Sequence, residues 1–167
     1  MHVFVTGGTG TIGSAVVAEL LSNGHTVLGL ARSDASAQAL KEAGAEPLRG
    51  GIADLDVLRA GVAQSDGVIS LAFSPGYGSP DTLARAIAEE SAAVAALGEE
   101  LIGSDRPIVT VSGTPWVPGR PSIEADPLPT DGPVGGRGSY GQCAAGAGVA
   151  WSSQLGCPYA TYRAQRR

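Results

Sequence analysis

Near its start the chain reads Val3-Phe4-Val5-Thr6-Gly7-Gly8-Thr9-Gly10-Thr11-Ile12-Gly13. The apolar run that begins this stretch predicts a buried strand, and the apolar spacing after it predicts a helix over residues 12–22. Gly7 permits a tight turn out of the strand, Gly10 lets backbone N–H groups approach a pyrophosphate, and Gly13 lets the helix pack close to the sheet. The helix start adds N–H donors and the positive end of a dipole. The junction therefore predicts a dinucleotide-binding loop.

The same alternation of short apolar strands and amphipathic helices continues for about 110 residues. Expected strands cover residues 3–6, 26–31, 46–49, 67–73 and 107–112, and expected helices cover residues 12–22, 33–43, 55–63 and 81 to about 102. Asp54 and Asp81 are the expected N-caps of the last two helices. Strands that alternate with helices predict βαβ units. The fold class is therefore α/β, with a Rossmann-type doubly wound parallel sheet in three αβα layers, incomplete at the C-terminus.

The composition changes towards the end of the chain. Six prolines lie within residues 114–133, and the last 36 residues contain four arginines and no acid. We therefore expect a dinucleotide-binding domain over residues 1–131 and an atypical segment over residues 132–167. That segment could hold the last helix and strand of the same domain, over residues 142–154 and 158–162. Alternatively, it is the truncated or frame-shifted end of a longer ancestor.

The composition and net charge of the chain argue against some classes of binding partner. The chain has 167 residues, 43% of them hydrophobic, and a formal charge of −5 with a pI near 4.9. This acidity argues against nucleic acid or an anionic membrane as a partner. The sequence has neither a signal-peptide pattern nor an apolar run long enough to span a bilayer, so we expect a cytoplasmic protein. Cys143 and Cys157 have no zinc-type spacing, so we expect free thiols and no metal.

The end of the second expected strand bears on the choice of cofactor. An acidic residue there would bind the adenosine ribose hydroxyls of NAD, and Leu30 and Ala31 cannot do so. Arg32, with Ser33 as a second donor, can instead pair with a 2′-phosphate. The sequence therefore favours NADP(H) over NAD(H). Asp34 could still accept a hydrogen bond from a ribose hydroxyl, which keeps NAD(H) open.

These residues resemble the short-chain dehydrogenase/reductase superfamily, and within it the extended or atypical branch of NAD-dependent epimerase/dehydratase-like proteins. The resemblance covers about residues 1–125 and rests on the glycine loop, on Gly24-His25-Thr26-Val27, on Leu30-Ala31-Arg32-Ser33, on Arg49-Gly50-Gly51-Ile52-Ala53-Asp54, on Val68-Ile69-Ser70-Leu71-Ala72-Phe73 and on Val109-Thr110-Val111-Ser112-Gly113-Thr114. Gly51 stands where the family usually has an Asp beside the adenine. The resemblance implies that the cofactor contacts Gly7, Thr9, Gly10, Thr11, Ile12, Gly13, Arg32, Ser33, Ile52, Leu71, Ala72 and Phe73.

The resemblance also implies a catalytic site, but this sequence departs from the family's usual one. Ser112 is the candidate for orienting a small carbonyl or hydroxyl substrate, with Thr114 beside it. The family's Tyr-x-x-x-Lys pair is absent, because Lys41 is the only lysine and follows Ala37 by four residues. Tyr140 has Ala144 at the lysine position, so we expect a packing role for it rather than a catalytic one.

Three functions remain open from the sequence. The first is an oxidoreductase or epimerase-type enzyme with an atypical site. The second is a nucleotide-binding sensor or regulator without turnover, and the third is a degenerate fragment. The long helix that begins near Asp81 commonly mediates pairing in the family, so a homodimer is an expectation as well.

Overall fold

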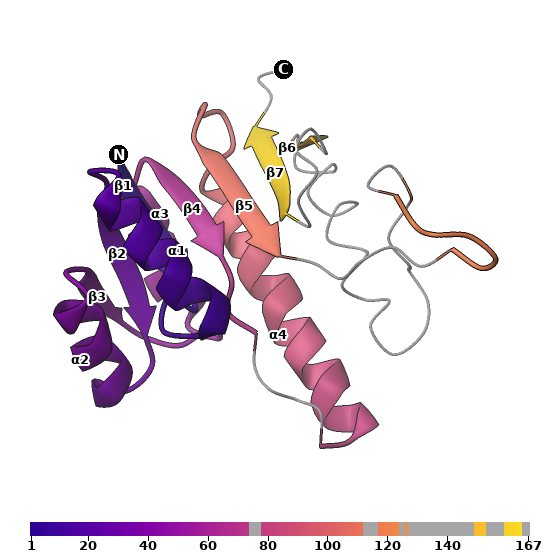
Figure 1. Ribbon diagram of the computed structural model, residues 1–167, viewed down its shortest axis with the longest axis horizontal. Coiled ribbons are helices and arrows are strands. Elements are labelled where there is room, and N and C mark those ends of the chain that lie inside the picture. Colours follow the sequence, from indigo (N-terminus) through magenta and orange to yellow (C-terminus); the bar gives the residue numbers. More distant parts are fainter. Residues whose placement is uncertain (74–77, 112–116, 124–125, 127–148, 153–158, 165–167) are drawn as a thin grey trace.

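The computed structural model describes residues 1–73, 78–111, 117–123, 126, 149–152 and 159–164. Its described strands form one sheet in the order β3-β2-β1-β4-β5-β7-β6, and the first five of these are parallel (Figure 1). The parallel strands are β1 (His2–Thr6), β2 (Thr26–Ala31), β3 (Glu46–Arg49), β4 (Gly67–Ser70) and β5 (Pro107–Val111). The expected Rossmann-type sheet is thereby confirmed.

Helices cover both faces of the sheet. They are α1 (Thr11–Ser22), α2 (Asp34–Glu42), α3 (Leu55–Ala63) and α4 (Pro80–Glu99). Side chains alternate between the two faces along a strand, so Val3 and Val5 of β1 pack in a cluster with Val17 and Leu40 of α1 and α2. Between them, Phe4 points the other way, into a cluster with residues of α3 and α4. A strand that is buried on both faces explains the continuous apolar run in the sequence.

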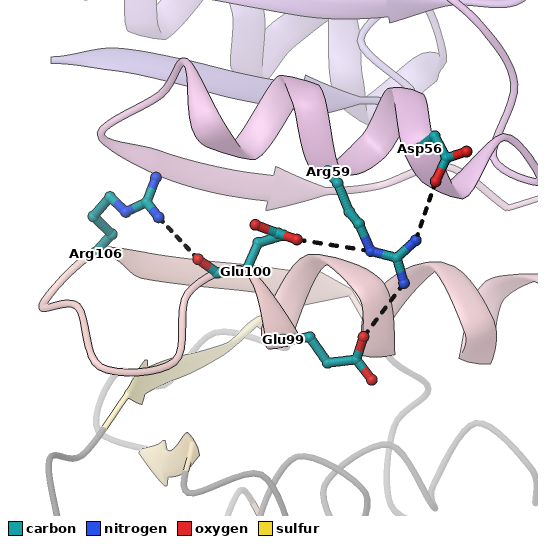
Figure 2. Close-up of polar contacts among 5 residues, drawn as sticks. All are labelled: Asp56, Arg59, Glu99, Glu100 and Arg106. Atoms are coloured by element: carbon teal, nitrogen blue, oxygen red, sulfur yellow. Dashed lines mark hydrogen bonds and ion pairs between the residues drawn. The ribbon is translucent and has the colours of Figure 1, made fainter.

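Arginines tie α3 to α4 where the two helices pack together (Figure 2). The guanidinium of Arg59 on α3 lies 3.4 Å from carboxylate oxygens of Asp56 and Glu99 and 3.7 Å from one of Glu100. Arg106, just before β5, donates through Nη1 to the carbonyl oxygens of Val62 and Ser65, at 2.7 and 3.0 Å. Its Nη2 donates to the Glu100 carbonyl at 2.9 Å, so one side chain joins the ends of both helices.

Of the two expected helix caps, Asp81 is wrong and Asp54 is confirmed in its position. Ser79 rather than Asp81 caps α4: its hydroxyl accepts the Thr82 N–H, and Pro80 occupies the first helical position. A hydroxyl cap followed by proline satisfies the helix start, which leaves Asp81 in the first turn. Asp54 does occupy the N-cap position of α3, but its carboxylate accepts the Gly51 N–H at 2.6 Å instead of a helix N–H.

The C-terminal part of the sheet corrects another expectation. The structure has β6 (Val149–Ser152) inside the range 142–154, for which the sequence predicts a helix. The expected last strand is confirmed as β7 (Tyr159–Ala164), which runs antiparallel to β5 and lies beside it in Figure 1. β6 pairs antiparallel with β7. Because glycines lower the intrinsic helix preference of this stretch, pairing with a neighbouring strand overrides it.

The strand order reverses between β1 and β4. From β1 the chain builds outward through β2 and β3 on one side, and then returns to place β4 and β5 on the other side. In open α/β sheets, ligands bind outside the carboxyl ends of the strands at such a reversal of strand order. The glycine loop leaves β1 at this point.

Candidate functional site

The glycine loop is a tight turn whose shape is imposed by the chain itself. Gly7 has φ +71°, a left-handed conformation that favours glycine. A Cβ on Gly7 would lie 2.8 Å from the Ala72 nitrogen, and a Cβ on Gly13 would lie 2.0 Å from the Gly7 carbonyl oxygen. The Gly10 N–H donates to that same oxygen at 3.0 Å, which closes the turn. Gly7 and Gly13 are therefore required by the fold, as the spacing predicts.

Gly10 differs from the other two glycines, and the difference bears on ligand binding. Its φ of −78° and ψ of 175° are open to any residue. A Cβ there would have the Gly7 oxygen, at 3.3 Å, as its one near neighbour among the described residues. The described fold thus constrains this exposed position less than Gly7 or Gly13, although a Cβ would press on the Gly7 oxygen. A group that approaches the backbone from outside the chain would supply a further reason for glycine, as a bound pyrophosphate does.

The start of α1 suits an anion. Gly10 is its N-cap and supplies no side-chain cap, and the first turn of α1 holds no acidic residue. The first N–H groups of a helix have no partner within it, and they carry the positive end of the helix dipole. Thr9, Thr11 and Ile12 are exposed around this helix start. The loop therefore fits the diphosphate of a dinucleotide, with Ile12 as an apolar surface beside it.

Thr6 joins the carboxyl ends of β1 and β4, between which the strand order reverses. Its buried hydroxyl oxygen accepts the N–H groups of Leu71 and Ala72, each at 3.2 Å, and lies 3.3 Å from the Ser70 hydroxyl oxygen. β4 ends at Ser70, so the residues from Leu71 to Phe73 leave the strand and pass beside the glycine loop. This role of Thr6 was not predicted from the sequence. A threonine that ends an otherwise apolar strand was the available signal.

The residues that bear on the choice between a ribose 2′-hydroxyl and a 2′-phosphate lie at and just after the ends of β2 and β3. Arg32 is exposed, and Ser33 caps α2 by accepting the Ser36 N–H at 3.2 Å in a capping box. Asp34 follows in the first turn of α2, and its Oδ1 lies 2.8 Å from Nη2 of Arg49. The carboxylate that could accept from a ribose hydroxyl is therefore already paired with a guanidinium.

The remaining predicted site residues fall into two groups. Ile52 follows β3 and is half-buried against the core cluster around Phe4, and Leu71 packs against the cluster around Val5. Ser112, Thr114 and Tyr140 lie outside the described residues, as do both cysteines.

The sole lysine lies away from the carboxyl ends of the strands. Lys41 is exposed in the last turn of α2, and α2 begins at the carboxyl end of β2. Its last turn therefore lies towards the opposite edge of the sheet. The structure thus gives Lys41 no place beside the carboxyl ends of β1 and β4.

The described part of the chain contains neither a cluster of metal ligands nor a membrane-spanning helix. Within those ranges, no three His, Cys, Asp or Glu side chains gather in a way that could hold a metal ion. None of the helices described here combines the length and the apolar character that crossing a membrane requires.

Comparison with known proteins places this geometry in a family. The model of the NAD dependent epimerase/dehydratase family matches residues 3–161. An uncharacterized protein of Schizosaccharomyces pombe is 44% identical over 114 residues, which make up 68% of this chain and 38% of that protein. The sterol-4-alpha-carboxylate 3-dehydrogenase, decarboxylating, of Dictyostelium discoideum is 38% identical over 71 residues, or 42% of this chain and 22% of that enzyme. The chain thus spans well under half the length of these relatives.

Solved structures show the same fold. The UDP-Glc/GlcNAc 4-epimerase of Campylobacter jejuni matches with a TM-score of 0.69 at 17% identity, and the match covers 87% of this chain and 48% of the epimerase. The likeness at this identity concerns the fold alone.

Proposed function

This chain belongs to the NAD dependent epimerase/dehydratase family, whose members bind NAD(P), and from that premise we propose that it binds NADP(H) in preference to NAD(H) and acts as an oxidoreductase on a small carbonyl or hydroxyl substrate. The observation that carries the proposal is the loop from Gly7 to Gly13. There a tight turn, an exposed Gly10 backbone and an uncapped helix start converge on one point.

Each part of the dinucleotide has residues to hold it. The loop residues Gly7, Thr9, Gly10, Thr11, Ile12 and Gly13 would receive the diphosphate. Arg32, with Ser33, would bind the adenosine 2′-phosphate, and Ile52 would lie beside the adenosine. Leu71, Ala72 and Phe73 would line the path of the cofactor past β4. When bound, the nicotinamide supplies or accepts a hydride.

Ser112 is the residue that we propose for orienting the substrate. In the sequence it directly follows Val111, the last residue of β5, and the carboxyl end of β5 lies at the same edge of the sheet as the glycine loop. A serine hydroxyl there can donate a hydrogen bond to a carbonyl oxygen. Such a bond polarises the carbonyl and fixes its orientation, which is the role that the family resemblance implies.

A second function is favoured by one specific feature, the absence of a Tyr-x-x-x-Lys pair. In that pair the lysine cation lowers the pKa of the tyrosine, so that the phenol can exchange a proton. Lys41 is the only lysine and lies at the end of α2. The alternative is therefore a protein that binds the dinucleotide as a sensor or regulator, without turnover.

A fluorescence titration with NADPH and NADH, followed by a panel of small carbonyl compounds, tests both functions. Turnover of any carbonyl supports the enzyme, and micromolar binding without turnover supports the sensor. If neither dinucleotide binds, both are wrong.

Two variants test the assignment of the residues. Gly10→Val should abolish binding, because its side chain would occupy the space of the diphosphate. Arg32→Ala should weaken NADPH binding more than NADH binding. An equal effect on the two dinucleotides would remove the argument for a 2′-phosphate contact.

A further inference from the structure

We propose that Arg49 is a second guanidinium for the 2′-phosphate of NADP(H), and that it also neutralises Asp34, so that the pair of residues sets the selectivity against NAD(H). The inference rests on the proposed function, because it places the adenosine half of the dinucleotide over the ends of β2 and β3. It adds two specificity-determining residues, neither of which touches the reacting atoms.

The sheet brings Arg49 next to Arg32. β2 and β3 are parallel neighbours whose register pairs Ala31 with Arg49, and the Gly50 N–H donates to the Ala31 carbonyl at 3.1 Å. Adjacent parallel strands lie about 4.8 Å apart. Arg49 therefore ends β3 beside Ala31, the residue before Arg32, so both arginines lie at the carboxyl edge of the sheet. Both are exposed.

The contact with Asp34 turns Arg49 towards the start of α2. Nη2 of Arg49 lies 2.8 Å from Oδ1 of Asp34, and Asp34 directly follows Ser33, the N-cap of α2. Arg49 therefore reaches across the end of β2 to the segment that also holds Arg32 and Ser33. A guanidinium has five N–H donors, so an arginine held at this point can serve a second acceptor beside the carboxylate.

The negative charge of Asp34 is the reason that its ion pair with Arg49 bears on the choice between NADP(H) and NAD(H). A bare carboxylate at this place would accept from a ribose hydroxyl and would repel a 2′-phosphate, and both effects favour NAD(H). The guanidinium of Arg49 offsets that charge. The Asp34 side chain is fully exposed, and exposed ion pairs contribute little to stability. A phosphate, which carries nearly two charges at neutral pH, can therefore compete for the same donors at low cost.

The test measures affinity rather than activity. Kd values for NADPH and NADH are determined by fluorescence titration for the wild type, Arg49→Ala, Arg49→Lys and Arg49→Ala/Asp34→Ala. Competition by 2′,5′-ADP and by 5′-AMP isolates the adenosine half of the ligand. Lys41→Ala is the matched control, since it removes one exposed positive charge from the far end of α2. Thermal melts establish that each variant folds.

Arg49→Ala should weaken the binding of NADPH and 2′,5′-ADP by about 10- to 100-fold, as expected for a lost hydrogen bond between charged groups. The binding of NADH and 5′-AMP should stay within about 3-fold of wild type or become tighter. The NADPH affinity of Arg49→Lys should lie between those of the wild type and Arg49→Ala, because lysine keeps the charge but loses the planar fork of donors. Removing Asp34 as well should recover part of the NADPH loss, and Lys41→Ala should change nothing.

Two results would overturn the inference and leave the proposed function standing. In one, the wild type binds NADPH but Arg49→Ala keeps its preference or weakens both dinucleotides equally. In the other, the double variant recovers no NADPH affinity, which would remove the neutralising role of Arg49. Failure of the wild type to bind either dinucleotide would overturn the proposed function, and this inference with it.

Discussion

Thr6 shows how a single side chain can join two strands at the point where the site forms. Its hydroxyl oxygen accepts the Leu71 and Ala72 N–H groups, and its carbonyl oxygen also accepts the Leu71 N–H at 3.1 Å. Ala72 therefore depends on the hydroxyl, whereas Leu71 has a second acceptor. Because the Gly7 turn packs directly against the Ala72 nitrogen, the hydroxyl also fixes the wall beside the glycine loop.

Replacing this hydroxyl by a methyl group should therefore destabilise the fold. We expect Thr6→Val to lower the free energy of unfolding by about 1–3 kcal/mol, the usual cost of a buried polar group that loses its partner. Thr6→Ser keeps the hydroxyl and loses only one methyl group, so its cost should stay near 1 kcal/mol. Urea denaturation measures both. A larger loss in Thr6→Ser than in Thr6→Val would show that packing, and not the hydrogen bond, sets the stability at this position.

At the scale of the elements, the sequence predicts the parallel strands and their helices to within a few residues. Hydrophobic periodicity explains this agreement. Strands that are buried on both faces are continuous apolar runs, and helices that are buried on one face are amphipathic. The helix starts are less readable: several polar residues near a start can act as the cap, and Ser79 does so in place of Asp81. The strand β6 was missed because its pairing partner β7 lies beyond it in the chain, and a local pattern does not report such pairing.

Arg106 gives a prediction about how helix ends are held. Its guanidinium donates to the carbonyl oxygens of Val62 and Ser65. It also donates to the Glu100 carbonyl oxygen, a bond that Figure 2 shows. The last carbonyls of a helix lack partners within it, and a cation there also interacts favourably with the dipole. We expect Arg106→Ala to lower the free energy of unfolding by about 2–3 kcal/mol, measured by urea denaturation.

Arg59 is the matched control for Arg106. It faces three carboxylates on the exposed side of the same pair of helices, at 3.4 to 3.7 Å. Such exposed ion pairs contribute about 1 kcal/mol or less. The prediction for Arg106 would be wrong if Arg59→Ala proved as costly as Arg106→Ala.

The segment after β5 gives a prediction about pH. A hydrogen bond from Arg120, and then one from the Ile123 N–H, lower the pKa of Asp126 below its ordinary value. An acid whose pKa is lower in the folded state stabilises that state above the unfolded pKa, about 3.9, and this contribution is lost as the pH falls through the folded pKa. Asp126→Asn should therefore speed amide exchange at Ile123 at pH 6, and the difference from wild type should shrink below about pH 4. Asp105→Asn removes an exposed acid on another loop, and it should leave amide exchange at Ile123 as in the wild type.

At the scale of the whole molecule, the candidate site is assembled from segments that are distant in the sequence. The glycine loop was readable in advance because all its parts lie within seven residues. The pairing of Asp34 with Arg49 was not, since it depends on the register of β2 against β3. The same holds for the bonds from Thr6 to Leu71 and Ala72, which join β1 to the end of β4. A motif within one short segment can be predicted from the sequence, whereas contacts between strand ends depend on the order and register of the strands in the sheet.

Because the cofactor would contact the ends of several strands at once, its binding should stabilise the fold as a unit. A ligand that binds only the folded state at 100 times its Kd adds about 2.7 kcal/mol to the free energy of unfolding. For a chain of this size, we expect NADPH at that concentration to raise Tm by about 5–10 °C. NADH at the same concentration should raise it less, and Gly10→Val should show no shift with either. A shift in Gly10→Val as large as in the wild type would place the dinucleotide somewhere other than at the glycine loop.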